Sequence, residues 1–218
     1  GPDDISPKIL KLGAEELAPG LTTIFQHSLD SGSPPEDWLL ANVTPIHKKG
    51  DRTCPGNYRP ISLTSVSSKL YEHILHSHIM KHLDRLDILT DKQHGFRAHH
   101  SCETQLIQTV HDLALSLEKK QQTDLIIMDF SKAFDSVPHN RLLLKLNQYG
   151  ITGNIHAWLT KFLTCRRQRV VLGGASSSWN TVISGVPQGT VIGPLMFLIY
   201  LNDLPEGISS PIRLFADD

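Results

Sequence analysis

The sequence has few cysteines, no long apolar run and no strong excess of one charge. Its three cysteines, Cys54, Cys102 and Cys165, are odd in number and far apart. They form neither a disulfide framework nor a zinc pattern, so we expect a reducing compartment. The longest apolar run, residues 191–201, contains a Gly-Pro pair and is too short to cross a bilayer, which predicts a buried helix and no membrane partner. The first residues lack the pattern of a secretory signal.

What the sequence does contain is the composition of a folded protein with one large domain or two small ones. Of its 218 residues, 39% are hydrophobic and 20% are charged, which is enough to bury a core. The net charge is −1, but residues 41–100 hold nine Lys or Arg against five Asp or Glu, with eight of the twelve histidines. This mildly basic region is compatible with phosphate contacts, and equally with a solvated helical face.

Alternating helical and extended patterns predict an α+β fold. Helical periodicity or helix-start signals occur at residues 6–17, 21–29, 66–83, 101–120, 138–150, 154–164 and 194–203. Extended patterns occur at residues 39–47, 58–65, 124–129, 166–185 and 211–218. We expect 39–47 and 58–65 to form a hairpin around a basic turn, 166–185 to form a second hairpin, and 124–129 to be a short buried strand.

Three carboxylates follow two of the predicted strands. Asp129 ends "LIIMD", and Asp217 and Asp218 end "PIRLFADD". An acid after an apolar strand is costly unless it is solvated, paired or bound to a metal. If the two strands are neighbours, the acids converge and repel one another unless a divalent cation neutralises them, and Mg²⁺ prefers such oxygen ligands. Taken singly, each acid has an ordinary explanation as a helix cap or a surface turn.

Three other segments carry side chains suited to a nucleotide. Phe134 lies five residues after Asp129, where a bulky ring would exclude a ribose 2′-hydroxyl by steric clash. Gln188 offers a polar group in the loop "SGVPQGTVIGP", whose glycines permit close approach. Lys48 and Arg59 belong to the first predicted hairpin, where a guanidinium can bind a phosphate through two hydrogen bonds. Core packing, a simple turn and exposed cations are the alternative explanations.

Five segments occur in an order that resembles a known family: "NYRPISL", "QHGFRAHHSCETQL", "DFSKAFDSVPH", "GVPQGTVIGPLMFLIYLNDL" and "FADD". Together they resemble the reverse transcriptase domain of LINE-type (non-long-terminal-repeat), jockey-like retrotransposons over nearly the whole chain. The resemblance implies a right-hand polymerase fold, with mainly fingers over residues 1–123 and an antiparallel palm sheet packed on helices over 124–218. It also implies an RNA-directed DNA polymerase that adds dNTPs to a primer 3′-hydroxyl.

The same resemblance assigns roles to individual residues. Two catalytic Mg²⁺ ions, with Mn²⁺ as a substitute, would be held by Asp129 and Asp217, with Asp218 completing the triad and the Phe130 carbonyl as a further ligand. The incoming nucleotide would contact Lys48, Arg59, Phe134 and Gln188. The RNA template and DNA primer would contact Arg97, Arg166 and Arg167. No obligate protein partner is implied, and the location would be intracellular, in the nucleus or the cytoplasm.

The chain departs from the family because it stops after "FADD", where family members continue into a thumb. We therefore expect a fragment of such a protein. The main alternative is an inactive polymerase fold that only binds RNA. A second alternative is a histidine metal site, since His78 and His82 are four residues apart on a predicted helix. RNA-templated RNA polymerases and group II intron maturases are two further alternatives, both related to the resembled family.

Overall fold

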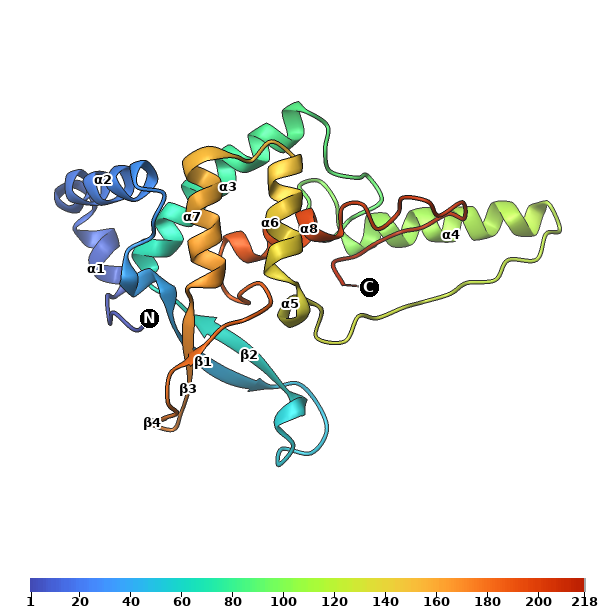
Figure 1. The fold of residues 1–218 in the computed structure, drawn as a ribbon. Coiled ribbons are helices and arrows are strands. Elements are labelled where there is room, and N and C mark those ends of the chain that lie inside the picture. Colours follow the sequence, from blue (N-terminus) through green and yellow to red (C-terminus); the bar gives the residue numbers. More distant parts are fainter. Residues whose placement is uncertain (218) are drawn as a thin grey trace.

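The computed structural model describes residues 1–217. Figure 1 shows a central group of helices, a sheet that projects below it, and one long helix, α4, that extends to the right. The N-terminal helices cover the left side: α1 (Pro7–Leu12) begins at Ser6, whose side chain accepts from the Lys8 amide, and α2 (Ala14–Asp30) follows it. None of the helices within residues 1–217 has the length and apolar character that a membrane crossing requires.

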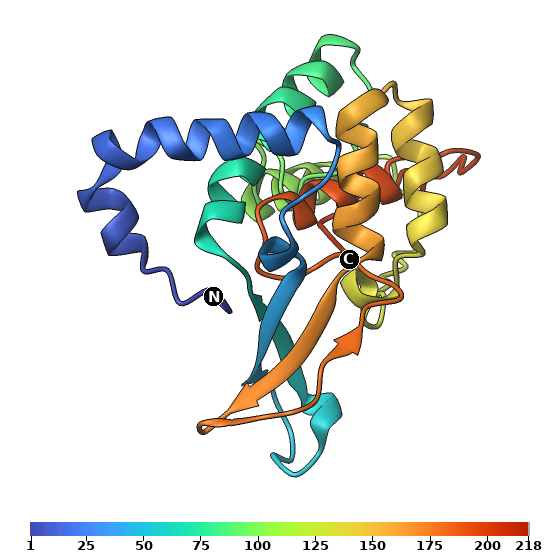
Figure 2. The same ribbon diagram turned by 60° about the vertical axis from the view of Figure 1, so that its left-hand side comes forward.

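The sheet confirms the first predicted hairpin and adds a strand from much later in the chain. After the short helix η1 (Glu36–Leu39), strand β1 (Leu40–His47) pairs antiparallel with β2 (Tyr58–Leu63), and η2 (Pro55–Asn57) lies in the turn between them. Strand β3 (Arg167–Leu172) lies parallel to β1 on its other side. It also pairs antiparallel with two short strands, β4 (Ala175–Ser176) and β5 (Asn180–Thr181), so residues 166–185 form the second predicted hairpin with β3 as its long strand. The view in Figure 2 shows these long strands side by side.

The hydrophobic core lies between four helices, which are α3 (Val66–Arg85), α6 (His139–Gln148), α7 (Gly153–Thr164) and α8 (Ile192–Leu201). Helix α8 is buried on nearly all sides, as its continuous apolar sequence predicts. In this core the Tyr71 ring packs at tilted angles against the rings of Trp38 and Trp158, with centroids 5.5 and 5.3 Å away. The two indole N–H groups are satisfied, because Trp158 donates to the Ser28 hydroxyl and Trp38 to the Ser67 hydroxyl.

Helix α4 (Cys102–Glu118) begins as predicted at Ser101, which forms a capping box with Thr104. The chain then runs without regular structure to α5 (Ala133–Ser136). Much of the apolar face of α4 is open to solvent: Leu106, Val110 and Leu117 are all more than half exposed. This side of the molecule therefore has apolar residues but no core of its own among the described residues.

The prediction of a buried strand over residues 124–129 is wrong for this structure. The segment has no strand assignment, and Ile126 and Ile127 are 81% and 82% exposed. The predicted last strand is reduced to a single parallel bridge between Gln93 and Leu214. Apolar sequence alone does not make a strand, since each strand needs a neighbour for its backbone groups and a layer to cover its side chains. The expected antiparallel palm sheet is accordingly not formed among residues 1–217.

Candidate functional site

The two described acids of the predicted triad come from segments that meet. The backbone N–H of Phe130, directly after Asp129, donates to the carbonyl oxygen of Asp217 at 3.2 Å. Asp129 is exposed and Asp217 is partly buried. Asp218 lies outside the described residues. The fold thus brings together the backbones at Asp129 and Asp217, which are 88 positions apart in the sequence, through one hydrogen bond and not through a continuous strand pair.

The donor atoms at this meeting point suit a hard divalent cation. Carboxylates and backbone carbonyls are the oxygen ligands that Mg²⁺ and Mn²⁺ take in proteins. Within residues 1–217, no three acidic, histidine or cysteine side chains gather closely enough to form a metal site. Asp129 and Asp217 lie on backbone segments that one hydrogen bond joins, and such carboxylates can receive an ion that brings its own waters and a substrate phosphate. The residues present therefore fit the predicted ion.

Phe134 is held firmly by other aromatic rings. Its ring stacks on Phe197 of α8 with centroids 4.2 Å apart and planes inclined by 15°, and it meets Phe96 edge-on at 5.9 Å. Lys132, two residues earlier, has a left-handed backbone with φ of 52°, so the chain turns sharply into α5. The ring therefore has little freedom to move.

The loop that carries Gln188 is packed between β2 and α5. The Gln188 carbonyl accepts from the Ser62 amide at 2.8 Å, and its side-chain amide donates to Asp135 Oδ1 at 3.3 Å. A Cβ on Gly185 would lie 2.7 Å from the Asp135 backbone, and one on Gly189 would lie 2.7 Å from the Ser62 carbonyl oxygen. Both glycines are thus required for the close packing of this loop, which is tighter than a simple turn.

Asp135 is a residue of this region that the sequence reasoning missed. Burial raises its pKa, and the hydrogen bond from Gln188 only partly opposes this shift. The signal in the sequence was the second acid of "DFSKAFD", four residues before a histidine, His139, that bonds the Gly185 carbonyl.

Lys48 and Arg59 both lie at the far end of the β1–β2 hairpin. Arg59 on β2 is opposite Ile46, and Lys48 follows the end of β1 with its amide bonded to the Asn57 carbonyl at 2.8 Å. Both side chains are exposed, and neither forms an ion pair within residues 1–217. This end of the hairpin therefore carries two exposed cations, Lys48 and Arg59, that form no ion pair with an acidic side chain among residues 1–217.

The three arginines predicted to contact template or primer are placed differently from one another. Arg167 is exposed at the start of β3, with its guanidinium 5.9 Å from the Trp179 ring centre. Arg97 is partly buried and donates to the Thr90 carbonyl at 3.3 Å. Arg166 is only 2% exposed and lies over the Phe162 ring.

The burial of Arg166 corrects the prediction for this residue. Burial lowers its pKa to about 10, although nearby Glu72 opposes the shift, and its Nη1 has no partner among the described residues. A side chain without open surface does not reach a nucleic acid strand, so we withdraw Arg166 from the strand contacts. The sequence does not show which of the neighbouring residues Arg166 and Arg167 is buried. Successive side chains along a strand point to opposite sides, so the answer depends on the residue at which β3 begins.

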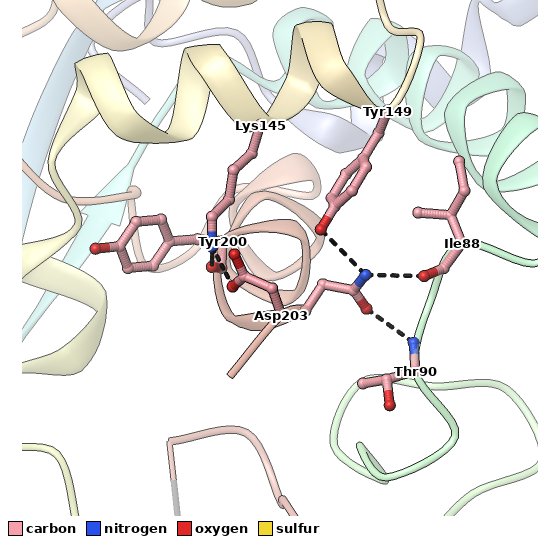
Figure 3. A network of polar contacts seen from close by, with 7 residues as sticks. Ile88, Thr90, Lys145, Tyr149, Tyr200 and Asp203 are labelled. Atoms are coloured by element: carbon pink, nitrogen blue, oxygen red, sulfur yellow. Dashed lines mark hydrogen bonds and ion pairs between the residues drawn. The ribbon is translucent and has the colours of Figure 1, made fainter. Parts of the chain in front are cut away.

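A polar network anchors the segment that leads to Arg97. Asn202, after α8, accepts from the Thr90 amide and donates to the Ile88 carbonyl, both at 2.8 Å, and it also donates to the Tyr149 hydroxyl at 3.3 Å. Figure 3 shows these partners, with Lys145 bonded to Asp203 and to the Tyr200 carbonyl beside them. The signal for this anchor was "YLND", polar residues directly after an apolar helix.

The chain is similar to known proteins over most of its length. Residues 46–218 match the family described as reverse transcriptase (RNA-dependent DNA polymerase). The chain is 32% identical, over its whole length, to "Probable RNA-directed DNA polymerase from transposon X-element" of Drosophila melanogaster, of which it covers 25%. It is 30% identical over 94% of its length to "RNA-directed DNA polymerase from mobile element jockey" of the same species, covering 22% of that protein.

A more distant relative is "Retrovirus-related Pol polyprotein from type-1 retrotransposable element R2" of Popillia japonica, which is 27% identical over 86% of the chain and of which the chain covers 28%. The chain thus spans about a quarter of the length of these curated relatives. The matched part includes Lys48 and Arg59, all of β2, the Gln188 loop and both segments that carry the acids.

Proposed function

This chain belongs to the reverse transcriptase (RNA-dependent DNA polymerase) family, within the LINE-type retrotransposon group, and from this premise we propose that it copies RNA into DNA by adding dNTPs to a primer 3′-hydroxyl. The observation that carries the proposal is the contact between the two acid-bearing segments, where Phe130 donates to the Asp217 carbonyl at 3.2 Å. A polymerase of this kind needs carboxylates from both segments at one place.

Asp129 and Asp217 would hold the divalent ions of the reaction, together with Asp218, and the Phe130 carbonyl is a further oxygen donor nearby. When bound there, Mg²⁺ or Mn²⁺ would supply Lewis-acid stabilisation of the primer oxygen and of the departing pyrophosphate. The carboxylates of this chain supply the negative charge that holds the ions in place and leave room for the substrate phosphates.

The nucleotide would lie between the hairpin and the Phe134 ring. Lys48 and Arg59 would bind the triphosphate, since both are exposed and free of acidic partners within residues 1–217. Phe134 would exclude a ribose 2′-hydroxyl, and its stacking on Phe197 keeps it from moving aside. Gln188 would lie beside the nucleotide, held by Asp135.

We further propose that the RNA template and DNA primer cross the surface that includes Arg97 and the exposed Arg167. In this arrangement residues 1–123 form mainly fingers and residues 124–218 mainly palm. Strand β3, from the second part, joins the sheet of the first part beside β1, so the fingers would also include this strand.

The test is primer extension on an RNA template with Mg²⁺, comparing the chain with Asp129→Ala. We expect the variant to lose at least about 100-fold in rate, because one set of ion ligands is removed. A control variant, Asp124→Asn, changes a carboxylate in the same exposed segment and should retain the activity. Equal rates for the chain and Asp129→Ala would contradict the proposal.

The second candidate function is RNA binding without catalysis. It is favoured by one observation, the exposed apolar segment 125–128, where the expected palm strand is not formed. Under this alternative the chain would bind RNA equally well with Asp129 or Ala at this position, and no extension product would appear with either protein.

A further inference from the structure

The side chain of Gln93 is bonded to the backbone that carries Asp217. Its Oε1 accepts from the Ala216 amide at 2.9 Å, and its Nε2 donates to the Ala216 carbonyl at 3.2 Å. The same Oε1 accepts from the Gly95 amide at 2.7 Å. These partners determine which end of the amide is the oxygen, since two N–H groups face Oε1 and a carbonyl faces Nε2.

This contact is buried and is part of a larger one. Gln93 is only 4% exposed. On either side of it the backbones are joined, because Leu214 donates to the Lys92 carbonyl and His94 donates to the Leu214 carbonyl, each at 2.9 Å. The glutamine side chain thus extends a short backbone bridge by two positions, from Leu214 to Ala216.

Gly95 makes the close approach sterically feasible. A Cβ on this residue would lie 2.3 Å from the Ala216 nitrogen, closer than any real contact of this kind. The absence of a side chain at Gly95 lets the Gln93 amide and the Ala216 backbone meet. A residue with any side chain at this position would push the two segments apart.

Ala216 has a backbone conformation that requires support. Its φ is +56°, in the left-handed region that residues other than glycine rarely occupy. Such conformations persist where the surrounding structure holds them, and they are frequent at functional sites. Here the left-handed backbone of Ala216 is supported by a pair of hydrogen bonds with the Gln93 side chain, one donated and one accepted by Gln93. The next residue is Asp217, whose carbonyl receives the amide that follows Asp129.

We propose that Gln93 is a positioning residue of the ion-binding site: its side-chain amide fixes the backbone of Ala216 and thereby holds Asp217 beside Asp129. The role of Asp217 in this inference rests on the proposed function, whereas the bond between Gln93 and Ala216 does not. The sequence had directed attention in this motif to Arg97 as a template contact, and Gln93 had no assigned role.

The first experiment measures hydrogen exchange at the Ala216 amide by NMR on the ¹⁵N-labelled chain. We expect this amide to be protected at least about tenfold, because it is bonded and partly buried, and Gln93→Met to abolish the protection. Methionine has a similar length and volume but neither donates nor accepts here. An unprotected Ala216 amide in the unchanged chain, or equal protection in Gln93→Met, would overturn the inference without any need for activity.

The second experiment measures Mn²⁺ affinity by electron paramagnetic resonance, with no nucleic acid present. Loss of an outer residue that orients a metal ligand typically weakens binding by about 10- to 100-fold. We expect Gln93→Met to weaken Mn²⁺ binding by about tenfold, and Asp217→Asn by at least as much. Wild-type affinity in Gln93→Met, with weakened binding in Asp217→Asn, would refute the positioning role and leave the proposed function intact.

The matched control is Asn202→Leu. Asn202 anchors the same segment through Ile88 and Thr90 but does not touch Ala216. We expect a fall in melting temperature similar to that of Gln93→Met, with Mn²⁺ affinity within about twofold of the unchanged chain. Equal loss of affinity in both variants would show that general loosening, and not the Gln93 amide, is responsible. Unchanged affinity in Asp217→Asn would instead reject the ion site itself.

Discussion

Among single residues, side-chain amides hold loops of this chain in place by binding backbone groups. The Gln93 side chain binds the backbone of Ala216, and the Asn202 side chain binds two backbone groups of the segment before Arg97. Each bond fixes a loop that regular structure does not hold. Buried amides of this kind stabilise a single arrangement, because leaving them unpaired is costly.

The residue-scale prediction concerns Asp135 and pH. Burial raises its pKa above the ordinary 3.8, so the folded state binds this proton more tightly than the unfolded state. The stability of the chain should therefore fall as pH rises from 3.8 through the raised pKa. Asp135→Asn keeps the oxygen that accepts from Gln188 and has no charge. Its melting temperature, relative to the unchanged chain, should rise across this window and level off above it.

The control for this measurement is Asp124→Asn. Asp124 also accepts from a glutamine, Gln122, but it is exposed. Melting curves of this variant should follow those of the unchanged chain at every pH. If Asp135→Asn also follows them, the buried carboxylate has no measurable cost and the assignment of the pKa shift to burial is wrong.

At the scale of elements, the buried N-terminus of α8 is capped by a side chain from another helix. Glu72 of α3 is fully buried, and its Oε2 accepts from the amides of Val191 and Ile192 at 2.8 and 3.2 Å. Its other oxygen accepts from the Ser68 hydroxyl at 2.9 Å. The first amides of a helix have no partner within the helix, so this carboxylate satisfies them and complements the helix dipole.

The element-scale prediction is that Glu72→Ala destabilises the chain by about 3 kcal/mol, because two buried amides lose their acceptor and buried Arg166 loses a nearby negative charge. Urea unfolding followed by circular dichroism measures the change. Glu72→Gln keeps one acceptor and should cost less, and Glu118→Ala on the exposed end of α4 should cost less than about 0.5 kcal/mol. Equal unfolding midpoints for Glu72→Ala and Glu118→Ala would refute the capping role.

At the scale of the whole molecule, the described chain has one well-packed side and one open side. The core helices bury the large side chains, whereas residues 125–128 and the apolar face of α4, the long helix that extends away from this core in Figure 1, are exposed. Local stability follows buried contacts, so the two sides should open with different free energies.

The prediction at this scale is a difference in hydrogen exchange, measured by mass spectrometry. Amides of residues 125–128 should exchange within seconds, since they have no backbone partners among the described residues. Amides in α7 and α8 should remain protected for hours, because both helices are buried in the core. Slow exchange over 125–128 would mean that this segment is a paired strand in solution, as its sequence predicts.

Elements that depend on local sequence pattern could be predicted before the structure was known. The long helices and the β1–β2 hairpin follow from spacing and turn residues a few positions apart, and the family was indicated separately, by the resemblance of five ordered segments. Caps such as Ser101 could be predicted for the same reason, because their partners lie within one turn of helix.

Strand pairing, burial and hydrogen bonds that depend on a distant partner could be read only from the three-dimensional fold. It brought β3 beside β1, buried Arg166 while exposing Arg167, and left residues 124–129 without a strand partner among residues 1–217. It also joined Gln93 to Ala216, 123 positions away. Hydrogen bonding and burial at these positions depend on which groups the whole fold brings together, and no pattern within one segment contains that information.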